Sequence, residues 1–410
     1  MKIAKFSRWT LAAVLLLTGC KNFWNVSNST SGCTTSCATL SSGVFYVLNS
    51  NAGQVQIAGY SIVNGTLTSV TGSPYSLPSE PFSIAVAPNG NFLYVGTQSG
   101  IFRYTIATTG ALTLASSTAF YSDSSAASMQ VDSTDSWLID DSASTPAYLY
   151  AIPINSADGT LSTTRTVAPV QLGLIPTSHQ LAISPDNTNI FVALGTFGTA
   201  VIPFNANPGT GNSPLPASVS TTITVKTAGG SAESVAVDPS NKLLYIGETL
   251  AIPTSSTNTN TGGLRAFNYS SLSGATPTEI TGSPFASGGL TPVSILPAAS
   301  GGYVYVANST VSNGTNGSIS TTGDISGFTL TSSGTTYSLT ALSSIASAGT
   351  SPAAMAVDST GKVVLLVNSG GTPDLDVYTF DATSAGKLDS ALTSSTGTDP
   401  VGATAIAAIP

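Results

Sequence analysis

Residues 80–96, EPFSIAVAPNGNFLYVG, contain the pattern that decides the fold of this chain. They predict a strand over 83–87, a tight turn at 88–90 and an aromatic-rich second strand over 91–96, because Asn and Gly readily adopt turn conformations. The unit returns at 177–195 (TSHQLAISPDNTNIFVALG), 232–248 (AESVAVDPSNKLLYIGE) and 352–368 (SPAAMAVDSTGKVVLLVN), with looser copies at 128–141 and 292–308. A hairpin that returns every 45–60 residues, roughly, predicts a repeat architecture.

The composition fits many short strands joined by polar turns. Hydrophobic residues make up 41% of the 410 residues, which is enough for a large core, whereas only 7% are charged. A typical domain has about a quarter of its residues charged, so Ser, Thr, Asn and Gly must cover most of this surface. Because aromatic and β-branched residues recur throughout, the chain is predicted to be folded and all-β.

The number of repeats predicts a closed ring of seven blades. Seven aromatic-rich second strands are expected, at 44–49, 92–96, 136–140, 190–194, 243–247, 303–307 and 363–367. Six first strands begin near 83, 127, 179, 233, 292 and 353, and the seventh lies at the C-terminus, over 402–409. We therefore expect the C-terminal strand to complete blade one, which removes the exposed sheet edges of an open array.

Stacking is the physical reason for the ring, because a four-stranded sheet with two apolar faces cannot bury both of them alone. Seven four-stranded blades fall within the range of β-propellers and predict about 28 strands. A string of immunoglobulin-like sandwiches is the rival, but each would need about 100 residues. The predicted fold is thus a seven-bladed β-propeller over 43–410.

The N-terminus resembles a bacterial lipoprotein signal. Lys2, Lys5 and Arg8 precede an apolar segment, 9–17, that is too short to span a bilayer. Leu-Thr-Gly-Cys at 17–20 resembles the lipobox, so 1–19 is expected to be a signal peptide and Cys20 to be acylated, which anchors the chain to a membrane. An ordinary secretory signal is the alternative. Lys21, in place of Asp, favours the outer membrane of a Gram-negative cell envelope.

Removal of 1–19 leaves 8 Lys and Arg against 19 Asp and Glu, a net charge of −11. Such an acidic chain lacks the basic surface that binds nucleic acid. It would also repel anionic phosphate substrates at long range.

Cys33 and Cys37 lie in a Ser/Thr-rich stretch, 20–42, that is expected to be a flexible tether. In an oxidising compartment a local disulfide is expected, with two free thiols as the alternative. Zinc would need further ligands, and the chain has one His. Asp132, Asp135, Asp140 and Asp141 suggest calcium, but their spacing does not match a calcium-binding loop. We expect no metal and no cofactor.

The unit IAVAPNGNFLYVGT resembles the YVTN repeats of bacterial surface propellers and the lactonase family of seven-bladed propellers, which includes 6-phosphogluconolactonase. The resemblance covers 43–410. Members of that family carry a His ahead of one first strand, where this chain has His179. They carry an Arg-His pair before the next first strand and an Asn-Glu at the end of its second strand. The matching positions in this chain hold Glu233 and Ser234, and Gly247 and Glu248, so the glutamate alone is retained.

Lactone hydrolysis needs a base to activate water and a donor for the developing oxyanion. His179, Glu233 and Glu248 are the candidate catalytic residues, because first-strand starts and second-strand ends meet at one face of a propeller. Glu80, Gln180 and Ser234 are expected on the rim of the same face. The alternative is that His179 is a hydrogen-bonded rim residue and that the glutamates are solvated.

Two long polar insertions, 254–263 and 309–327, are predicted on that face in adjacent blades. Repeat proteins often bind ligands through such loops. The function predicted first is therefore binding of a protein, an envelope polysaccharide or a small ligand. A lactonase-type hydrolase acting through His179 is the second prediction, and an architectural envelope protein is the third.

Overall fold

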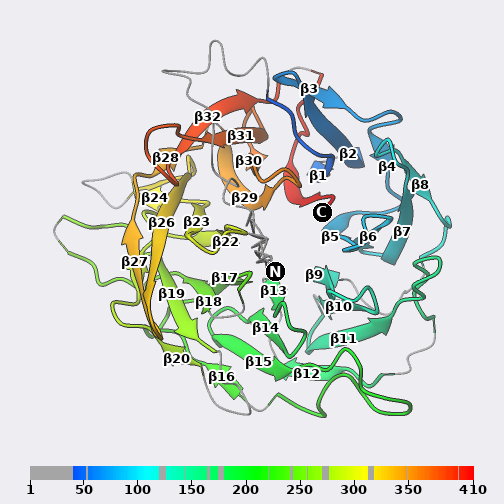
Figure 1. The fold of residues 1–410 in the computed structure, drawn as a ribbon, viewed down its shortest axis with the longest axis horizontal. Coiled ribbons are helices and arrows are strands. Elements are labelled where there is room, and N and C mark those ends of the chain that lie inside the picture. The colour runs from blue at the N-terminus through cyan, green and yellow to red at the C-terminus, as the bar shows by residue number, and fades with distance from the viewer. Residues whose placement is uncertain are drawn as a thin grey trace, which may run out of the picture.

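The computed structural model is a ring of seven β-sheets around a central channel (Figure 1). It describes residues 40–410 except 52–53, 120–125, 143, 164–166, 174–179, 220, 241–242, 256, 270–276, 313–317, 348 and 396. The predicted signal peptide, Cys20, Cys33, Cys37 and His179 lie outside the described residues. No helix in the described part of the chain is long and apolar enough to cross a bilayer.

Each blade has four antiparallel strands, which follow one another from the channel outward. Blades 1 to 4 are β33 (Ala403–Ala408), β1 (Phe45–Asn51), β2 (Gln54–Val63) and β3 (Thr66–Ser69); β5 (Pro81–Val86), β6 (Phe92–Thr97), β7 (Gly100–Ile106) and β8 (Leu112–Leu114); β9 (Ala126–Val131), β10 (Trp137–Ser142), β11 (Ala147–Pro153) and β12 (Val170–Gly173); and β13 (Gln180–Ile183), β14 (Asn189–Ala193), β15 (Thr199–Pro203) and β16 (Thr221–Ile223).

Blades 5 to 7 follow the same order. They are β17 (Ala232–Val237), β18 (Leu243–Glu248), β19 (Gly263–Asn268) and β20 (Thr278–Glu279); β22 (Pro292–Pro297), β23 (Tyr303–Asn308), β26 (Asp324–Ser333) and β27 (Thr336–Ala341); and β29 (Thr350–Val357), β30 (Val363–Gly370), β31 (Leu375–Phe380) and β32 (Leu388–Thr393). The seven-bladed all-β fold predicted from the repeat is thereby confirmed.

Five short strands lie outside this pattern in the described residues. Three of them, β4 (Tyr75–Ser76), β21 (Phe285–Ala286) and β28 (Ile345–Ala346), pair with the third strands of blades 1, 5 and 6. The hairpin of β24 (Val311–Ser312) and β25 (Ile319–Ser320) belongs to the long insertion of blade 6. The sequence pattern did not predict them, because each is only two residues long.

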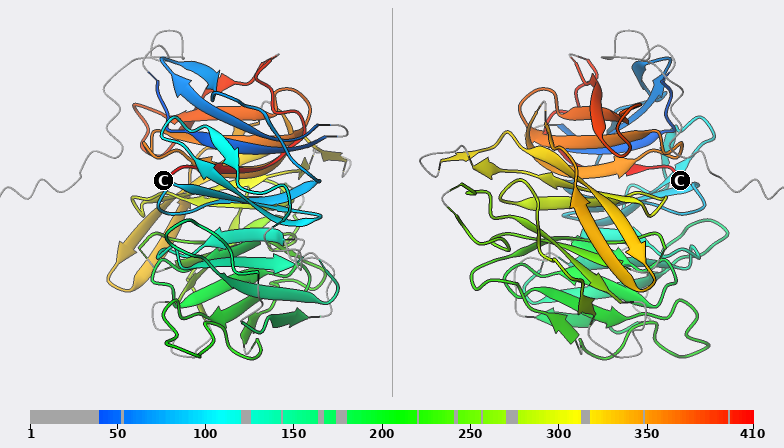
Figure 2. Two further views of the ribbon diagram at one scale, coloured as in Figure 1. Left: turned by 90° about the vertical axis from the view of Figure 1, so that its right-hand side faces the viewer. Right: turned by 60° about the vertical axis from the view of Figure 1, so that its left-hand side comes forward.

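The C-terminal strand closes the ring as predicted. β33 pairs antiparallel with β1 from Phe45 opposite Ala408 to Asn49 opposite Ala403. Because blade 1 is split between its first and second strands, both ends of the described chain lie on one face of the ring (Figure 2). We call this the lower face. The upper face is the opposite one, where first strands begin and second strands end.

The core lies between the blades. Second strands such as β18 are buried along their whole length, because each one lies between two neighbouring sheets. One core cluster joins Tyr94 of blade 2 to Leu138 and Ile152 of blade 3, and the six other clusters likewise cross from one blade to the next. No blade therefore buries its apolar faces without its neighbours.

Tyrosines in the second strands fasten neighbouring blades to each other. The Tyr46 hydroxyl donates to the Gly110 carbonyl at 2.6 Å, and that of Tyr94 donates to the Gly159 carbonyl at 2.8 Å. The Tyr305 hydroxyl bonds in the same way to Gly386 in blade 7, at 2.8 Å. Each glycine lies in a third-to-fourth strand turn of the next blade. A Cβ on Gly159, whose φ is +71°, would lie 2.5 Å from the Phe92 ring, so only glycine fits there.

Aspartates at the ends of first strands cap the hairpin turns. Asp132 Oδ1 accepts hydrogen bonds from the backbone N–H groups of Ser136, at 2.8 Å, and Trp137, at 2.7 Å. Asp358 Oδ1 accepts from the equivalent groups of Lys362 and Val363. The aspartate of the repeat is thus a turn residue, and among the described residues no cluster of His, Cys, Asp and Glu could hold a metal ion.

Substitution Tyr94→Phe tests the link between blades. It removes one oxygen and leaves the buried Gly159 carbonyl without its donor, which should cost about 1–3 kcal/mol of unfolding free energy. Urea unfolding followed by circular dichroism measures the loss. The control is Tyr148→Phe on β11, a half-buried tyrosine, which should change stability by less than about 0.5 kcal/mol. Equal stability of Tyr94→Phe and the parent would contradict the role given to this bond.

Candidate functional site

The described site candidates lie at the upper face, at first-strand starts and second-strand ends. Glu80 is exposed just before β5, Gln180 begins β13, and Glu233 and Ser234 follow one another in β17. Glu248 ends β18 opposite Ala232. The face predicted from the sequence is therefore the one on which these five residues lie, although their surroundings differ greatly.

Glu233 lies at a β-bulge at the upper end of β17. Ala232 pairs with Glu248 and Ser234 pairs with Gly247, so Glu233 is an extra residue between two regular pairs. Bulges re-aim the side chain that they carry. Blades 2, 6 and 7 have the same register shift, at Phe82, Val293 and Ala353. The repeat therefore places one such side chain per blade at the upper end of these first strands, half-buried at Glu233 and exposed at Phe82.

Glu248 is fully buried in an ion network. Its Oε1 lies 2.7 Å from Arg265 Nη1, and its Oε2 accepts the backbone N–H of Lys226 at 2.8 Å. Arg265 also binds Glu279, at 3.0 Å from Nε to Oε1, and Lys226 Nζ lies 3.1 Å from Glu279 Oε2. Burial raises the pKa of Glu248, and the Arg265 charge opposes that effect. With no exposed surface, this carboxylate cannot meet a substrate at the channel mouth.

In other blades, too, the residue at the position equivalent to Glu248 has a structural role. At their upper ends, the second strands of blades 2, 6 and 7 carry a buried polar residue that hydrogen-bonds to the connection arriving from the preceding blade. In blade 2 the Ser79 hydroxyl donates to Thr97 Oγ1 at 2.8 Å. The corresponding pairs in blades 6 and 7 are Ser287 with Asn308, at 2.8 Å, and Ser347 with Asn368, at 2.7 Å. Glu248 fastens the connection through Lys226 in the same way.

In blade 6 this buried pair is hydrogen-bonded to a carboxylate with a shifted pKa. Asn308 Nδ2 donates to Asp324 Oδ1 at 2.8 Å. Burial raises the pKa of Asp324 to about 6, and the hydrogen bond from Asn308 opposes the shift. Asp324 is the first residue of β26, directly after the long insertion of its blade.

Gln180 and Ser234, expected on the rim, join neighbouring first strands. Gln180 Oε1 accepts the backbone N–H of Val235 at 3.1 Å, and the Ser234 hydroxyl donates to the Pro292 carbonyl at 2.7 Å. In other blades, the residue at the same register position also forms a hydrogen bond from its side chain to the backbone of the next first strand. The pairs are Ser83 with the Ala126 carbonyl, Ser128 with the Leu181 N–H and Ser294 with the Met355 N–H. These bonds satisfy backbone groups along the channel edges of first strands, which have no further strand to pair with.

The two long insertions lie side by side, as the sequence predicted. Asn260 Oδ1, in the connection 249–262 of blade 5, accepts the backbone N–H of Ser312 in β24 of blade 6. The Thr310 carbonyl, in the same insertion of blade 6, accepts the Leu290 N–H at 2.8 Å. The upper face above blades 5 and 6 is therefore covered by one connected pair of loops.

Three exposed apolar side chains lie on upper-face loops of blades 4, 5 and 6, and we call them the upper apolar belt: Phe197, Leu250 and Ile319. Their exposed fractions are 58%, 43% and 65%. Gly195, in the loop of Phe197, exchanges backbone hydrogen bonds with Ala232 at the start of β17. The neighbouring Ser231 N–H donates to Thr249, which precedes Leu250. Farther along the same connection, Asn260 accepts from Ser312, which pairs with Ile319. The loops that carry the belt are therefore hydrogen-bonded to one another across blades 4, 5 and 6.

Sequence reasoning missed the belt because single apolar residues in polar loops carry no periodic signal. The described residues include six exposed large hydrophobic side chains, and five of them, Phe82, Phe197, Leu250, Ile319 and Val401, are at the upper face. The sixth is Val63, at the lower end of β2. Scattered exposed apolar residues need no explanation, but a collection on one face does.

Comparison with known proteins shows the class of fold. The chain is similar in structure to a putative 6-phosphogluconolactonase from Bacteroides uniformis, at 15% identity over 89% of this chain and 99% of that one, with a TM-score of 0.64. It is also similar to the periplasmic gluconolactonase of Pseudomonas aeruginosa, at 15% identity over 90% and 100%, with a TM-score of 0.62. A Lactobacillus plantarum protein matches at 18% identity and a TM-score of 0.62, over 90% and 99%.

No family model and no curated protein sequence matches the chain. The fold is thus a lactonase-like seven-bladed β-propeller. The residues that it presents on the upper face are this chain's own, with Glu248 held in an ion network and three large apolar side chains on the adjoining loops.

Substitution Arg265→Met tests the role of Glu248. It removes the cation 2.7 Å from a carboxylate that has no exposed surface, and loss of one partner of a buried pair typically costs about 3–5 kcal/mol. The double substitution Glu248→Gln with Arg265→Met should recover at least about half of that loss in urea unfolding. Glu80→Gln, at an exposed residue on the same face, should change stability by less than about 0.5 kcal/mol. A stable Arg265→Met protein would show that the network does not fasten the connection.

Proposed function

We propose that this protein is a binding module that engages a partner protein through its upper face. The observation that carries the proposal is the collection of five of the six exposed large apolar side chains of the described residues on that face. Contiguous apolar surface marks interaction sites, and the loops that carry Phe197, Leu250 and Ile319 are bonded to one another. Gln180, Ser234 and Glu248 on the same face are used in bonds within and between blades, which favours binding over chemistry.

The surroundings of the belt suggest the chemistry of the partner. Glu80 and Glu233 lie at the same face, and the chain without 1–19 has a net charge of −11. A partner that inserts apolar or aromatic side chains between the loops and carries Lys or Arg at the edge of its contact would suit this surface. Apolar anchors supply most of the affinity at protein interfaces, and complementary charges speed association.

The position of the chain ends supports an anchored arrangement. Gly65 N donates to the Leu40 carbonyl at 2.7 Å, and Gly43 N donates to Asp358 Oδ2 at 3.1 Å, so the chain enters the ring at the lower face. We propose that Cys20 is acylated and that the segment 20–39 links the membrane to this lower face. The upper apolar belt would then point away from the membrane, toward other proteins of the envelope.

Site-specific photocrosslinking in the native host tests the binding function. A photoreactive phenylalanine analogue at position 197, 250 or 319 should give the same crosslinked protein partner in intact cells. The matched control is position 63, because Val63 is also an exposed apolar residue, 49% accessible, but lies at the lower face. The triple substitution of the belt to serine should lower capture of the identified partner by at least about tenfold, equal to 1.4 kcal/mol. Equal adducts from position 63, or none from the belt, would overturn the proposal and favour an architectural role.

Lactone hydrolysis is the second candidate, favoured by the likeness to structures described as a putative 6-phosphogluconolactonase and a gluconolactonase. In that case His179, which directly precedes Gln180 in the chain, would activate water, and Glu233 would assist it. A panel of neutral and phosphorylated lactones should then show hydrolysis that His179→Ala reduces by about 100-fold or more, the range typical of general bases. Glu248→Gln serves as the comparison, since it should alter stability before activity. Hydrolysis unchanged in His179→Ala would contradict this assignment.

A further inference from the structure

A recess on the outer side of the ring, between blades 3 and 4, lies apart from the upper face. Its described lining comes from Trp137 and from the two longest connections between third and fourth strands, through residues 167–168 of the connection 154–169 in blade 3 and residues 206–209 and 211–213 of the connection 204–220 in blade 4. The equivalent connections are 64–65 in blade 1 and 334–335 in blade 6. Two neighbouring blades have thus gained the chain length that builds the recess.

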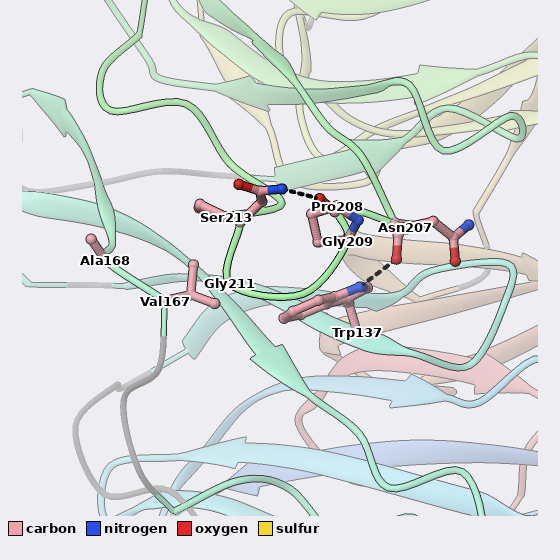
Figure 3. A pocket seen from close by; sticks show the side chains of 10 residues that line it. Trp137, Val167, Ala168, Asn207, Pro208, Gly209, Gly211 and Ser213 are labelled. Atoms are coloured by element: carbon pink, nitrogen blue, oxygen red, sulfur yellow. Dashed lines mark hydrogen bonds between the residues drawn. The ribbon is translucent and has the colours of Figure 1, made fainter.

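Internal bonds hold the blade 4 connection in one shape. Trp137 Nε1, at the start of β10, donates to the Ala206 carbonyl at 2.9 Å, and Asn212 Nδ2 donates to the Pro208 carbonyl at 2.9 Å (Figure 3). The ends of the connection are also joined, because Asn205 N donates to the Pro214 carbonyl at 3.0 Å. Its buried apolar residues, Phe204, Ala206 and Leu215, belong to the core cluster of blades 3 and 4. The recess is therefore formed before any ligand binds.

The lining combines an aromatic ring with uncharged polar groups. The recess has a volume of about 680 Å³, within the range of small-molecule sites, and none of its ten described lining residues is charged. The Trp137 ring forms one wall, and Val167 approaches it from the blade 3 connection (Figure 3). Opposite them are the Asn212 amide, the Ser213 hydroxyl and a backbone turn with glycines at 209 and 211, whose φ angles are +75° and +81°.

This combination selects one class of ligand. A purely apolar ligand would leave the amide and backbone groups unpaired. A sugar ring has an apolar face of C–H groups, suited to an indole, and an edge of hydroxyls, suited to amides and backbone groups. Trp137 already uses its N–H within the protein, so the ring face is the part left for stacking.

We propose that the recess between blades 3 and 4 binds an oligosaccharide, with one sugar ring stacked on Trp137 and its hydroxyls bonded to Asn212 and to the turn 208–211. The site is separate from the upper apolar belt, so a glycan and a partner protein can be bound at the same time.

The tryptophan content of the chain makes the site directly observable. The sequence has three tryptophans, and Trp9 and Trp24 both precede the propeller. In the full chain carrying Trp9→Phe and Trp24→Phe, all tryptophan emission comes from Trp137. Titration with trisaccharides of glucose, mannose, galactose and N-acetylglucosamine should give a saturable change of emission with at least one of them.

Two variants test the lining of the recess. Val167→Phe fills the recess and should abolish the response. Asn212→Ala removes the proposed bond to the ligand together with the bond to the Pro208 carbonyl that holds the loop, so it should weaken binding by about fivefold or more. Thr331→Ala, on the exposed part of β26, is the control and should bind as the parent does. Circular dichroism confirms that each variant is folded. No response to any of the four trisaccharides, or a response that persists in Val167→Phe, would overturn the proposal.

Discussion

Burial between blades is the constraint on which the whole structure depends. Each second strand is covered on both faces, and each core cluster crosses from one sheet to the next, so a blade is stable only beside its neighbours. The Tyr94 hydroxyl on the Gly159 carbonyl, and the Ser234 hydroxyl on the Pro292 carbonyl, add directional bonds to this packing. Closure by β33 on β1 leaves no blade with an uncovered face.

This constraint also explains why so many polar residues of the upper face do structural tasks. The channel edge of every first strand and the connection above every second strand carry backbone groups that need partners. Side chains such as Gln180 and Glu248 supply them. The loops can differ between blades in length and composition. The upper apolar belt and the recess beside Trp137 are both formed by such loops.

The repeat pattern was enough to predict the number of blades, the closing strand and the face on which the candidates lie. It was not enough to tell a catalytic glutamate from a structural one. Glu248 acquires its role from Arg265, Glu279 and Lys226, which lie on two other strands and one connection. No spacing in the sequence reveals that four such residues meet, because each belongs to a different part of the blade.

The sequence by itself determined the architecture, since strand periodicity, turn residues and the count of hairpins are local properties that repeat. Tertiary structure alone decided the accessibility of each side chain and the identity of its neighbours. Leu250 and Leu244 are the same residue type a few positions apart, yet the first is 43% exposed on a loop and the second is fully buried in β18. The physical reason is that exposure depends on the adjacent blade and its loops, which come from parts of the chain far away in sequence.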